Sequence, residues 1–277
     1  MSIHIITESS SDITQELAQQ LNITVLPIQL HIGNEDYIDG INLTKNRFYE
    51  LLIEEDVLPK TSQITPYAYE QATNEDEEYI IITIANELSG CYRNACFVAE
   101  GKKNIYVIDS RTACLGQYIL VKRACELRDA GKSFQEIIST LEEEKNKIHI
   151  IALMNTLEYL KKGGRISSVA YAAGALFGIK PVISIEDGKI VVLGKARGSK
   201  SGNNMLMEQV HKSGGINFDY PIALGYSGIS QTKLDKYIKD SSILYEGKVD
   251  HLPIIQIGPT IGTYAGEDAV VFAWFSK

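Results

Sequence analysis

The chain has 277 residues, of which 44% are apolar, and a formal net charge of −8 from 27 basic and 35 acidic side chains. An acidic total excludes a phosphate-backbone partner, because nucleic-acid binding requires a basic face. No stretch approaches the roughly 20 apolar residues that cross a bilayer, and the first residues lack the basic and apolar regions typical of a signal peptide. We therefore expect a cytoplasmic protein without a membrane span, and four cysteines that remain reduced.

Strand and helix patterns alternate through the first half of the chain. Such alternation predicts a parallel sheet with helices on both faces, whose ligands bind beyond the carboxyl ends of the strands. Residues 8–12 are expected to cap the first helix. Strands are expected at 3–7, 23–32, 79–84, 104–110 and 148–154, and helices around 17–21, at 44–53, from 66, and at 92–99, 112–129 and 133–145.

The pattern changes after a short helix at 157–162, which ends on a glycine pair. Glu186-Asp187-Gly188 lies between two apolar runs and predicts a hairpin. We therefore predict an α/β fold of two lobes, a Rossmann-like parallel lobe at 1–160 and a mixed α/β lobe with antiparallel pairs at 161–277. Strands of the second lobe are expected at 180–185, 189–193, 222–226, 242–245 and 269–275, and helices at 202–212 and 231–239.

Two loops have the features of anion-binding helix starts. Thr61 and Ser62 precede Thr65 and Pro66, which suit the N-cap and the first helical position. Leu88-Ser89-Gly90 follows a strand and precedes a helical pattern. Free backbone N–H groups and the helix dipole favour a negative group at such points, and hydroxyl groups add neutral donors. We expect both loops to converge on one small anion.

Several motifs together resemble the DegV family, and the resemblance covers nearly the whole chain. Their order and number make the match specific, although each motif alone is weak. The motifs are Thr7-Glu8-Ser9-Ser10-Ser11-Asp12, Thr61-Ser62-Gln63, Leu88-Ser89-Gly90, Ile108-Asp109-Ser110, Tyr159-Leu160-Lys161-Lys162-Gly163-Gly164-Arg165-Ile166-Ser167, Ile179-Lys180-Pro181 and Gly258-Pro259-Thr260-Ile261-Gly262-Thr263.

The resemblance implies a lipid carrier rather than an enzyme. Characterised members bind a long-chain fatty acid, whose carboxylate would lie on Thr61 and Ser89 and whose tail would lie in a tunnel between the lobes. In some bacteria the bound acid is presented to a fatty-acid kinase, which would be the protein partner. No cofactor, metal or catalytic residue is implied. Five further residues are candidates for ligand contact: Ser62, Gly90, Arg165, Thr263 and Tyr264.

The sequence departs from the family pattern near both ends. Family members usually have a histidine in a G-T-H-x-G-P-G motif, where this chain has Tyr264. Tyrosine donates a hydrogen bond to a carboxylate but carries no positive charge. Glu8 replaces the aspartate of a T-D-S motif, and Cys91 replaces the last threonine of L-S-G-T. We interpret the chain as a divergent member.

A hydrolase or phosphotransferase that acts on a small anion at the same site is the alternative. The sequence offers little for it, because Gly225-Tyr226-Ser227-Gly228-Ile229 lacks the last glycine of a nucleophile elbow and no phosphate-binding glycine loop appears. The five histidines are scattered. A third hypothesis is an interaction protein that uses the acidic run Glu142-Glu143-Glu144, although such runs are usually solvated helix faces.

Each candidate also has a purely structural interpretation. Thr61 and Ser89 would then shape a turn and cap a helix, and Arg165 would be a surface charge. The run 169–179, which includes Leu176 and Phe177, either lines the tunnel or forms an ordinary packed helix. Cys91 lies near a helix N-terminus, which lowers the pKa of some thiols and leads to the hypothesis of a reactive cysteine.

Overall fold

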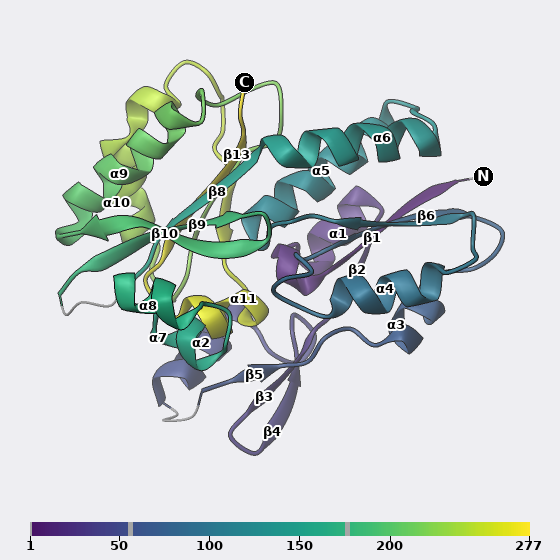
Figure 1. Ribbon diagram of the computed structural model, residues 1–277, viewed down its shortest axis with the longest axis horizontal. Coiled ribbons are helices and arrows are strands. Elements are labelled where there is room, and N and C mark those ends of the chain that lie inside the picture. The colour runs from purple at the N-terminus through teal and green to yellow at the C-terminus, as the bar shows by residue number, and fades with distance from the viewer. Residues whose placement is uncertain (1, 55–57, 175–177) are drawn as a thin grey trace.

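Four parallel strands form the sheet of the N-terminal lobe, in the order β2-β1-β6-β7. The structure, a computed structural model, describes residues 2–54, 58–174 and 178–277 (Figure 1). Ile80 to Ile82 are fully buried, as expected of a parallel strand covered on both faces. The elements of this lobe are β1 (Ile3–Glu8), α1 (Gln15–Leu21), β2 (Thr24–Leu26), α3 (Pro66–Gln71), β6 (Glu78–Thr83), α4 (Cys91–Ala99), β7 (Ile105–Asp109), α5 (Leu115–Asp129) and α6 (Phe134–Glu144).

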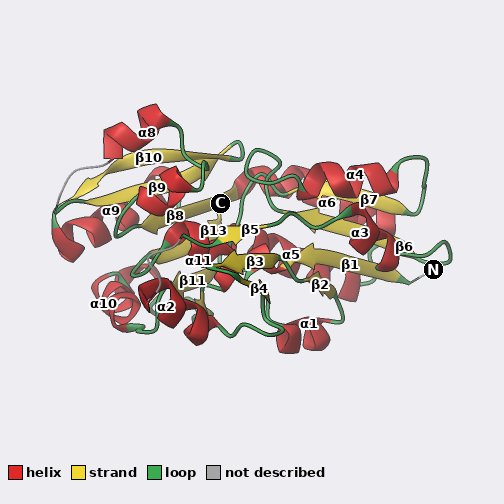
Figure 2. Cartoon of the chain, turned by 90° about the horizontal axis from the view of Figure 1, so that it is seen from below, coloured by secondary structure: helices red, strands yellow, loops and turns green. Residues whose placement is uncertain are grey.

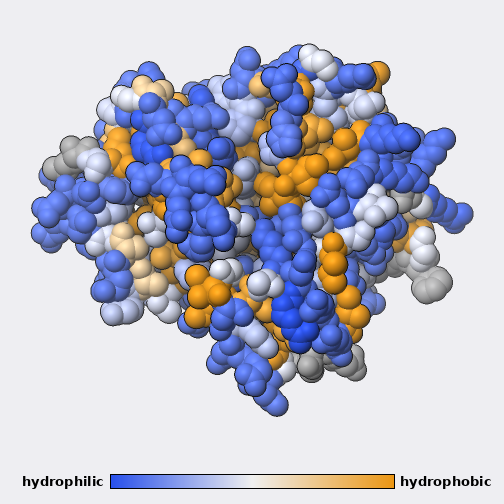
Figure 3. Space-filling model, turned by 180° about the vertical axis from the view of Figure 1, so that it is seen from behind, coloured by the Kyte–Doolittle hydropathy of each residue, from blue (hydrophilic) through white to orange (hydrophobic). Residues whose placement is uncertain are grey.

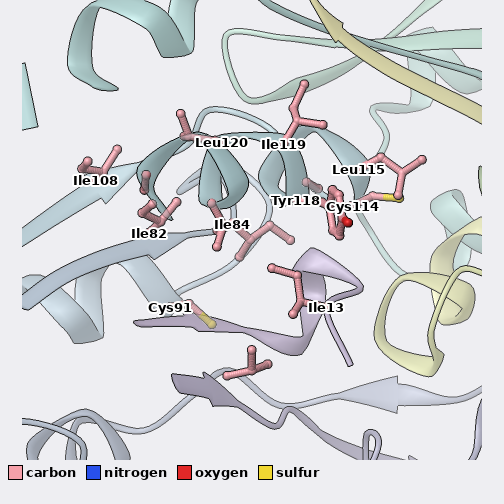
Figure 4. Packing of buried hydrophobic residues seen from close by; sticks show 14 of the residues in the cluster. Ile13, Ile82, Ile84, Cys91, Ile108, Cys114, Leu115, Tyr118, Ile119 and Leu120 are labelled. Carbon is pink, nitrogen blue, oxygen red and sulfur yellow. The ribbon is translucent and has the colours of Figure 1, made fainter. Parts of the chain in front are cut away.

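Helix α5 lies at the centre of the largest hydrophobic cluster. Leu115, Ile119 and Leu120 are fully buried and belong to the same cluster as Ile82 and Ile108 of the parallel sheet (Figure 4). The same cluster includes residues of the C-terminal strands β8 and β13. One continuous core therefore joins the two lobes.

The C-terminal lobe is built on a six-stranded sheet in the order β10-β9-β8-β13-β11-β12. All neighbouring pairs are antiparallel except β11 with β12. Helices α9 and α10 pack on one face, and the other face meets the N-terminal lobe (Figure 2). The elements are β8 (Ile148–Leu153), α7 (Glu158–Lys162), α8 (Ser168–Gly174), β9 (Lys180–Glu186), β10 (Lys189–Ala196), α9 (Gly198–Lys212), β11 (Ala223–Tyr226), α10 (Thr232–Asp240), β12 (Ile254–Gln256), α11 (Pro259–Ala265) and β13 (Val270–Phe275).

A third, small antiparallel sheet lies beside the two lobes, in the order β4-β3-β5 (Figure 1). The sequence analysis expects one strand over 23–32, but Pro27 separates β2 from β3, because proline cannot donate to a central ladder. The chain thereby leaves the parallel sheet and enters the small one. Its elements are β3 (Gln29–Ile32), β4 (Glu35–Ile38), α2 (Lys45–Glu54) and β5 (Lys60–Thr61).

The α/β architecture of a parallel lobe and a mixed lobe is confirmed, as is the hairpin at Asp187-Gly188, where both residues have positive φ. The expected boundary at residue 160 lies after β8, whereas β8 itself already belongs to the six-stranded sheet of the C-terminal lobe. The division into lobes at 1–160 and 161–277 therefore stays a prediction. β8 pairs antiparallel with β13 and β9, so it does not extend the parallel sheet.

Two local predictions are wrong. Residues 242–244 form a 3-10 turn rather than a strand, and its residue Leu244 is buried. Thr14 caps α1, whereas Ser9 to Ser11 form a 3-10 turn of their own. One helix was not predicted: the segment around Thr263 is α11, which begins at Pro259.

The surface seen from behind is largely hydrophilic, with apolar residues gathered near its middle (Figure 3). The most exposed large apolar side chains, Val169, Ile243 and Tyr67, come from three separate elements, namely α8, the 3-10 turn at Ser242–Leu244 and α3. Among residues 2–54, 58–174 and 178–277, no helix is long and apolar enough to cross a membrane.

Glu8, the residue that replaces the family aspartate, is fully buried at the carboxyl end of β1. Its carboxylate accepts hydrogen bonds from the hydroxyl of Tyr69 (2.7 Å), Nε2 of Gln117 (2.8 Å), the amide of Ile84 (3.2 Å) and the hydroxyl of Ser10 (3.2 Å). Burial nevertheless raises the pKa of Glu8. The carboxylate thus ties helix α3 and the end of β6 to β1.

The substitution Tyr69→Phe tests this network. It removes one donor from a buried carboxylate, and we expect a loss of about 1–3 kcal/mol in the free energy of unfolding. Urea titration at pH 7 measures the loss. Tyr67→Phe on the exposed face of the same helix is the matched control and should change stability by less than about 0.5 kcal/mol. Equal stability of the two variants would contradict the role of Tyr69.

Candidate ligand-binding site

A cavity lies between the two lobes and the small sheet. The empty space among its lining atoms is about 880 Å³, including its open mouth. Most of the lining is aliphatic and comes from both lobes. Its apolar residues are Ile28, Ile84, Leu88, Ala113, Ile150, Ile151, Ala152, Met154, Leu160, Ile183, Ile185, Ile190, Ile261, Ala265 and Val271.

Polar side chains lie together in one part of the lining. Thr61 and Tyr264 are connected by a hydrogen bond of 2.7 Å between their hydroxyl oxygens. Thr61 ends β5, whose position is fixed by pairing with Leu30 of β3. The amide of Ser62 donates to the carbonyl of Gln29, so Ser62 continues the small sheet at the cavity wall. Thr65 caps α3 and Pro66 begins it, as predicted.

Arg165 is the charged residue of the described lining. Its guanidinium carbon lies 4.8 Å from the centre of the Tyr264 ring. Its Nε donates to the carbonyl of Leu88 (3.2 Å) and its Nη1 to that of Gly163 (2.6 Å). Gly163 leaves room for the ring, because a Cβ there would stand 2.6 Å from Cδ1 of Tyr264. Arg165, one of the candidates for ligand contact, thus places a cation beside the hydroxyl groups of the lining.

Ser89 lines the cavity just before α4. Its hydroxyl accepts a hydrogen bond from the amide of Cys91 (3.3 Å) and donates to Sγ of Cys91 (3.2 Å). Cys91 is fully buried, and burial raises the pKa of its thiol to about 12. The hypothesis of a reactive Cys91 is therefore wrong, because desolvation outweighs the helix N-terminus. All four cysteines are free.

Two candidates from the sequence do not reach the cavity wall. Thr263 is buried, and its hydroxyl donates to the carbonyl of Pro259 within α11. Gly90 packs directly against the side chain of Gln63. Of the run 169–179, residues 175–177 with Leu176 and Phe177 lie outside the described residues. The described lining includes no residue of this run, and Val169 is 82% exposed.

Two buried carboxylates, which the sequence analysis missed, hold the start of α11. Asp12 Oδ1 accepts from the amide of Gly258 (2.6 Å), and Asp39 Oδ2 accepts from both the amide (3.1 Å) and the hydroxyl (2.6 Å) of Thr260. The Thr260 hydroxyl also lies 3.1 Å from that of Ser9. The sequence signals pointed only to local structure, because Asp12 was expected among the capping residues 8–12 and Asp-Gly at 39–40 is typical of a turn.

Burial raises the pKa of Asp12 to about 6 and also raises that of Asp39. The charge of Lys45 opposes both shifts, whereas Asp39 adds to the shift of Asp12. The second oxygen of Asp12, Oδ2, has no hydrogen-bond partner among the described residues. The described residues include no group of three metal-ligating side chains. These carboxylates therefore act on the backbone of α11.

The fold and the cavity define a class of protein: a two-lobed α/β protein whose internal apolar cavity ends on hydroxyl groups and an arginine. The chain belongs to the DegV family, because the model of the family described as "Uncharacterised protein, DegV family COG1307" matches residues 2–277.

Similar proteins agree with this assignment along the whole chain. A DegV domain-containing protein of Caldanaerobacter subterraneus subsp. tengcongensis is 32% identical over 275 residues, 96% of each chain. A solved DegV family protein from Thermus thermophilus, described as binding fatty acid, is 26% identical, with a TM-score of 0.88 and full coverage of both chains. A fatty acid binding DegV family protein from Streptococcus agalactiae is 29% identical, with a TM-score of 0.85 over 100% of this chain and 99% of its own.

The substitution Asp12→Asn tests the carboxylate beneath α11. A folded-state pKa of about 6, above the ordinary aspartate pKa of 3.8, means that the folded protein holds this proton more tightly than the unfolded chain does. The contribution of Asp12 to stability is therefore present below about pH 4 and is lost as the pH rises to 6. Two pKa units correspond to about 3 kcal/mol.

Urea titrations of both proteins at pH 4, 5, 6 and 7 measure this difference. The free energy of unfolding of the wild type should fall with pH relative to that of Asp12→Asn. Glu8 and Asp39 are present in both proteins, so the difference isolates Asp12. A difference that does not change with pH would show that Asp12 titrates normally.

Proposed function

We propose that the protein binds one long-chain fatty acid as a carrier, with the carboxylate on Thr61 and Ser89 and the tail in the cavity between the lobes. The observation that carries this proposal is the lining itself, which is mostly aliphatic and contains one arginine, whose guanidinium contacts the ring of Tyr264, the hydrogen-bond partner of Thr61. Such a cavity suits a molecule with one anionic end and a long apolar body. The fatty acids described for the Thermus and Streptococcus proteins support the same ligand class.

The head group would be held by donors that already lie together. Tyr264 connects Thr61 on one side to Arg165 on the other, and Arg165 contacts the carbonyl next to Ser89. A carboxylate at this point would replace the direct contact between the two hydroxyls. The arginine would offset the desolvation of the carboxylate, because a paired charge is less costly to bury. Tyr264 thus takes the position of the family histidine as a neutral donor.

Most of the binding free energy would come from the tail. Burial contributes ~0.8 kcal/mol per methylene, so about fifteen methylenes contribute on the order of 12 kcal/mol before ordering costs. Each charge-assisted hydrogen bond at the head adds roughly 1.5–3 kcal/mol. The head would therefore fix the orientation of the ligand, and the walls would supply the affinity.

The hydrolase or phosphotransferase alternative requires a base beside the nucleophile. The hydroxyl of Ser89 donates to a thiol whose pKa is raised to about 12, and Thr61 contacts a phenol. Neither partner favours proton abstraction at neutral pH. Turnover of a small anion that disappears in Ser89→Ala would favour the alternative. A fatty-acid kinase as partner remains a prediction from the family resemblance.

The first experiment is native mass spectrometry of the purified protein, followed by extraction and identification of the released lipid. We expect one fatty acid per chain. The Thr61→Ala/Ser89→Ala variant should bind hexadecanoate at least tenfold more weakly, because it loses two donors to the carboxylate. Ser139→Ala/Thr140→Ala on α6, outside the cavity lining, is the control and should bind as the wild type does. A protein that remains empty with a panel of fatty acids would overturn the proposal.

A second experiment separates the tail from the head. Ala152→Phe places a ring in the described lining and should weaken hexadecanoate binding more than Thr61→Ala does, because the tail supplies most of the affinity. Isothermal titration calorimetry gives both dissociation constants. Ala152→Ser, which nearly keeps the size of the side chain, is the matched control. Unchanged affinity in a folded Ala152→Phe protein would place the tail elsewhere.

A further inference from the structure

The sheet of the C-terminal lobe is split where β8 and β9 separate. These strands pair only between Ile151–Leu153 and Val182–Ser184. Each continues beyond that point with a different neighbour, since β8 pairs with β13 as far as Ile148 and β9 pairs with β10 as far as Glu186. Two adjacent strands of one sheet thus lose their mutual register and leave a gap beside Ile151 and Ser184.

Cavities lie on both sides of this gap. Ile151, Ser184 and Ile185 line the apolar cavity between the lobes, and the same three residues line a second cavity beside α9. Two consecutive residues of the N-terminal lobe also lie at both cavities: Thr112 lines the second cavity, and Ala113 lines the first. The two cavities therefore adjoin where the strands part.

The second cavity differs from the first in chemistry. The empty space among its lining atoms is about 1090 Å³, including its opening to solvent. His149 lies in its wall, with its ring stacked on Trp274 at 5.5 Å between centres. Gln209 contributes an amide from α9. Each cation of its lining lies near a carboxylate: Arg111 is 3.8 Å from Asp187, Lys145 is 2.7 Å from Glu142 and Lys212 is 2.8 Å from Glu208. Hydroxyl, amide and imidazole groups thus line the second cavity, next to the apolar cavity.

We propose that the fatty-acid cavity continues through the gap between β8 and β9 into this second cavity. The protein then accepts long-chain acids that carry a hydroxyl group at the end remote from the carboxylate. This inference rests on the proposed fatty-acid function. A terminal hydroxyl in a closed apolar tunnel would lose its hydrogen bonds to water, whereas beyond the gap it meets His149, Ser184 and Gln209. Because the three cations of this lining are already paired with carboxylates, the cavity favours a hydroxyl over a second carboxylate.

Paired ligands of equal length test the proposal. Dissociation constants of the wild-type protein are measured for saturated acids of 10 to 20 carbons and for their ω-hydroxy counterparts. At the length that spans the first cavity, we expect the two constants to agree within about threefold. A closed tunnel would weaken the hydroxy acid at least tenfold, the factor that corresponds to about 1.4 kcal/mol. A tenfold penalty at every length would overturn the inference.

A variant in the second cavity gives an independent result. His149→Leu/Gln209→Leu removes two polar groups that do not line the first cavity. Binding of hexadecanoate should stay within twofold of the wild type and show that the protein is folded, whereas 16-hydroxyhexadecanoate should bind at least tenfold more weakly. His211→Leu, an exposed histidine on the same helix, is the matched control. Equal effects of the variant on both ligands would also overturn the inference.

The outcomes separate this inference from the proposed function. Binding of hexadecanoate without binding of any ω-hydroxy acid would support the carrier function and contradict the passage into the second cavity. A wild-type protein that binds neither kind of acid would contradict both proposals.

Discussion

The arrangement of the cavity depends on two buried carboxylates that bind the backbone at the start of α11. Asp12 comes from the N-terminal lobe, Asp39 from the small sheet, and the amides of Gly258 and Thr260 from the C-terminal lobe. Each carboxylate has lost its hydration, and the backbone amides replace part of it. Because α11 also carries Tyr264, the same contacts that join three sheets set the position of the hydroxyl that meets Thr61.

Local patterns predicted the parts of the fold that depend on local energies. Thr65 and Pro66 fix the start of α3 through an N-cap and a preset φ, and Asp187-Gly188 fixes a hairpin through positive φ. The helix α11 was missed because its glycines favour a loop, and only contacts made by residues far away in sequence hold it. Gly262, for example, packs against Phe48 and Tyr49 of α2. Tertiary structure overrides propensity at such positions.

In the candidate site, too, some residues follow from local sequence patterns and others depend on distant contacts. Thr61 and Ser89 follow from helix starts, which the sequence displays, and both reach the cavity. Arg165 follows a glycine cap, and that position in the sequence favours a surface charge over a ligand contact. Its place at the cavity depends on the carbonyl of Leu88 and the ring of Tyr264, 77 and 99 positions away along the chain. No periodic pattern encodes contacts at such separations.

The hydrogen bond between Thr61 and Tyr264 joins residues 203 positions apart. Bringing together groups so distant in sequence costs chain entropy, which the contacts of the folded protein must offset. A ligand seated there would clamp both ends of that long loop and stabilise the whole chain by mass action. Protein turnover would then depend on occupancy. Proteases cut transiently opened chains, so they would remove the empty protein faster than the occupied one.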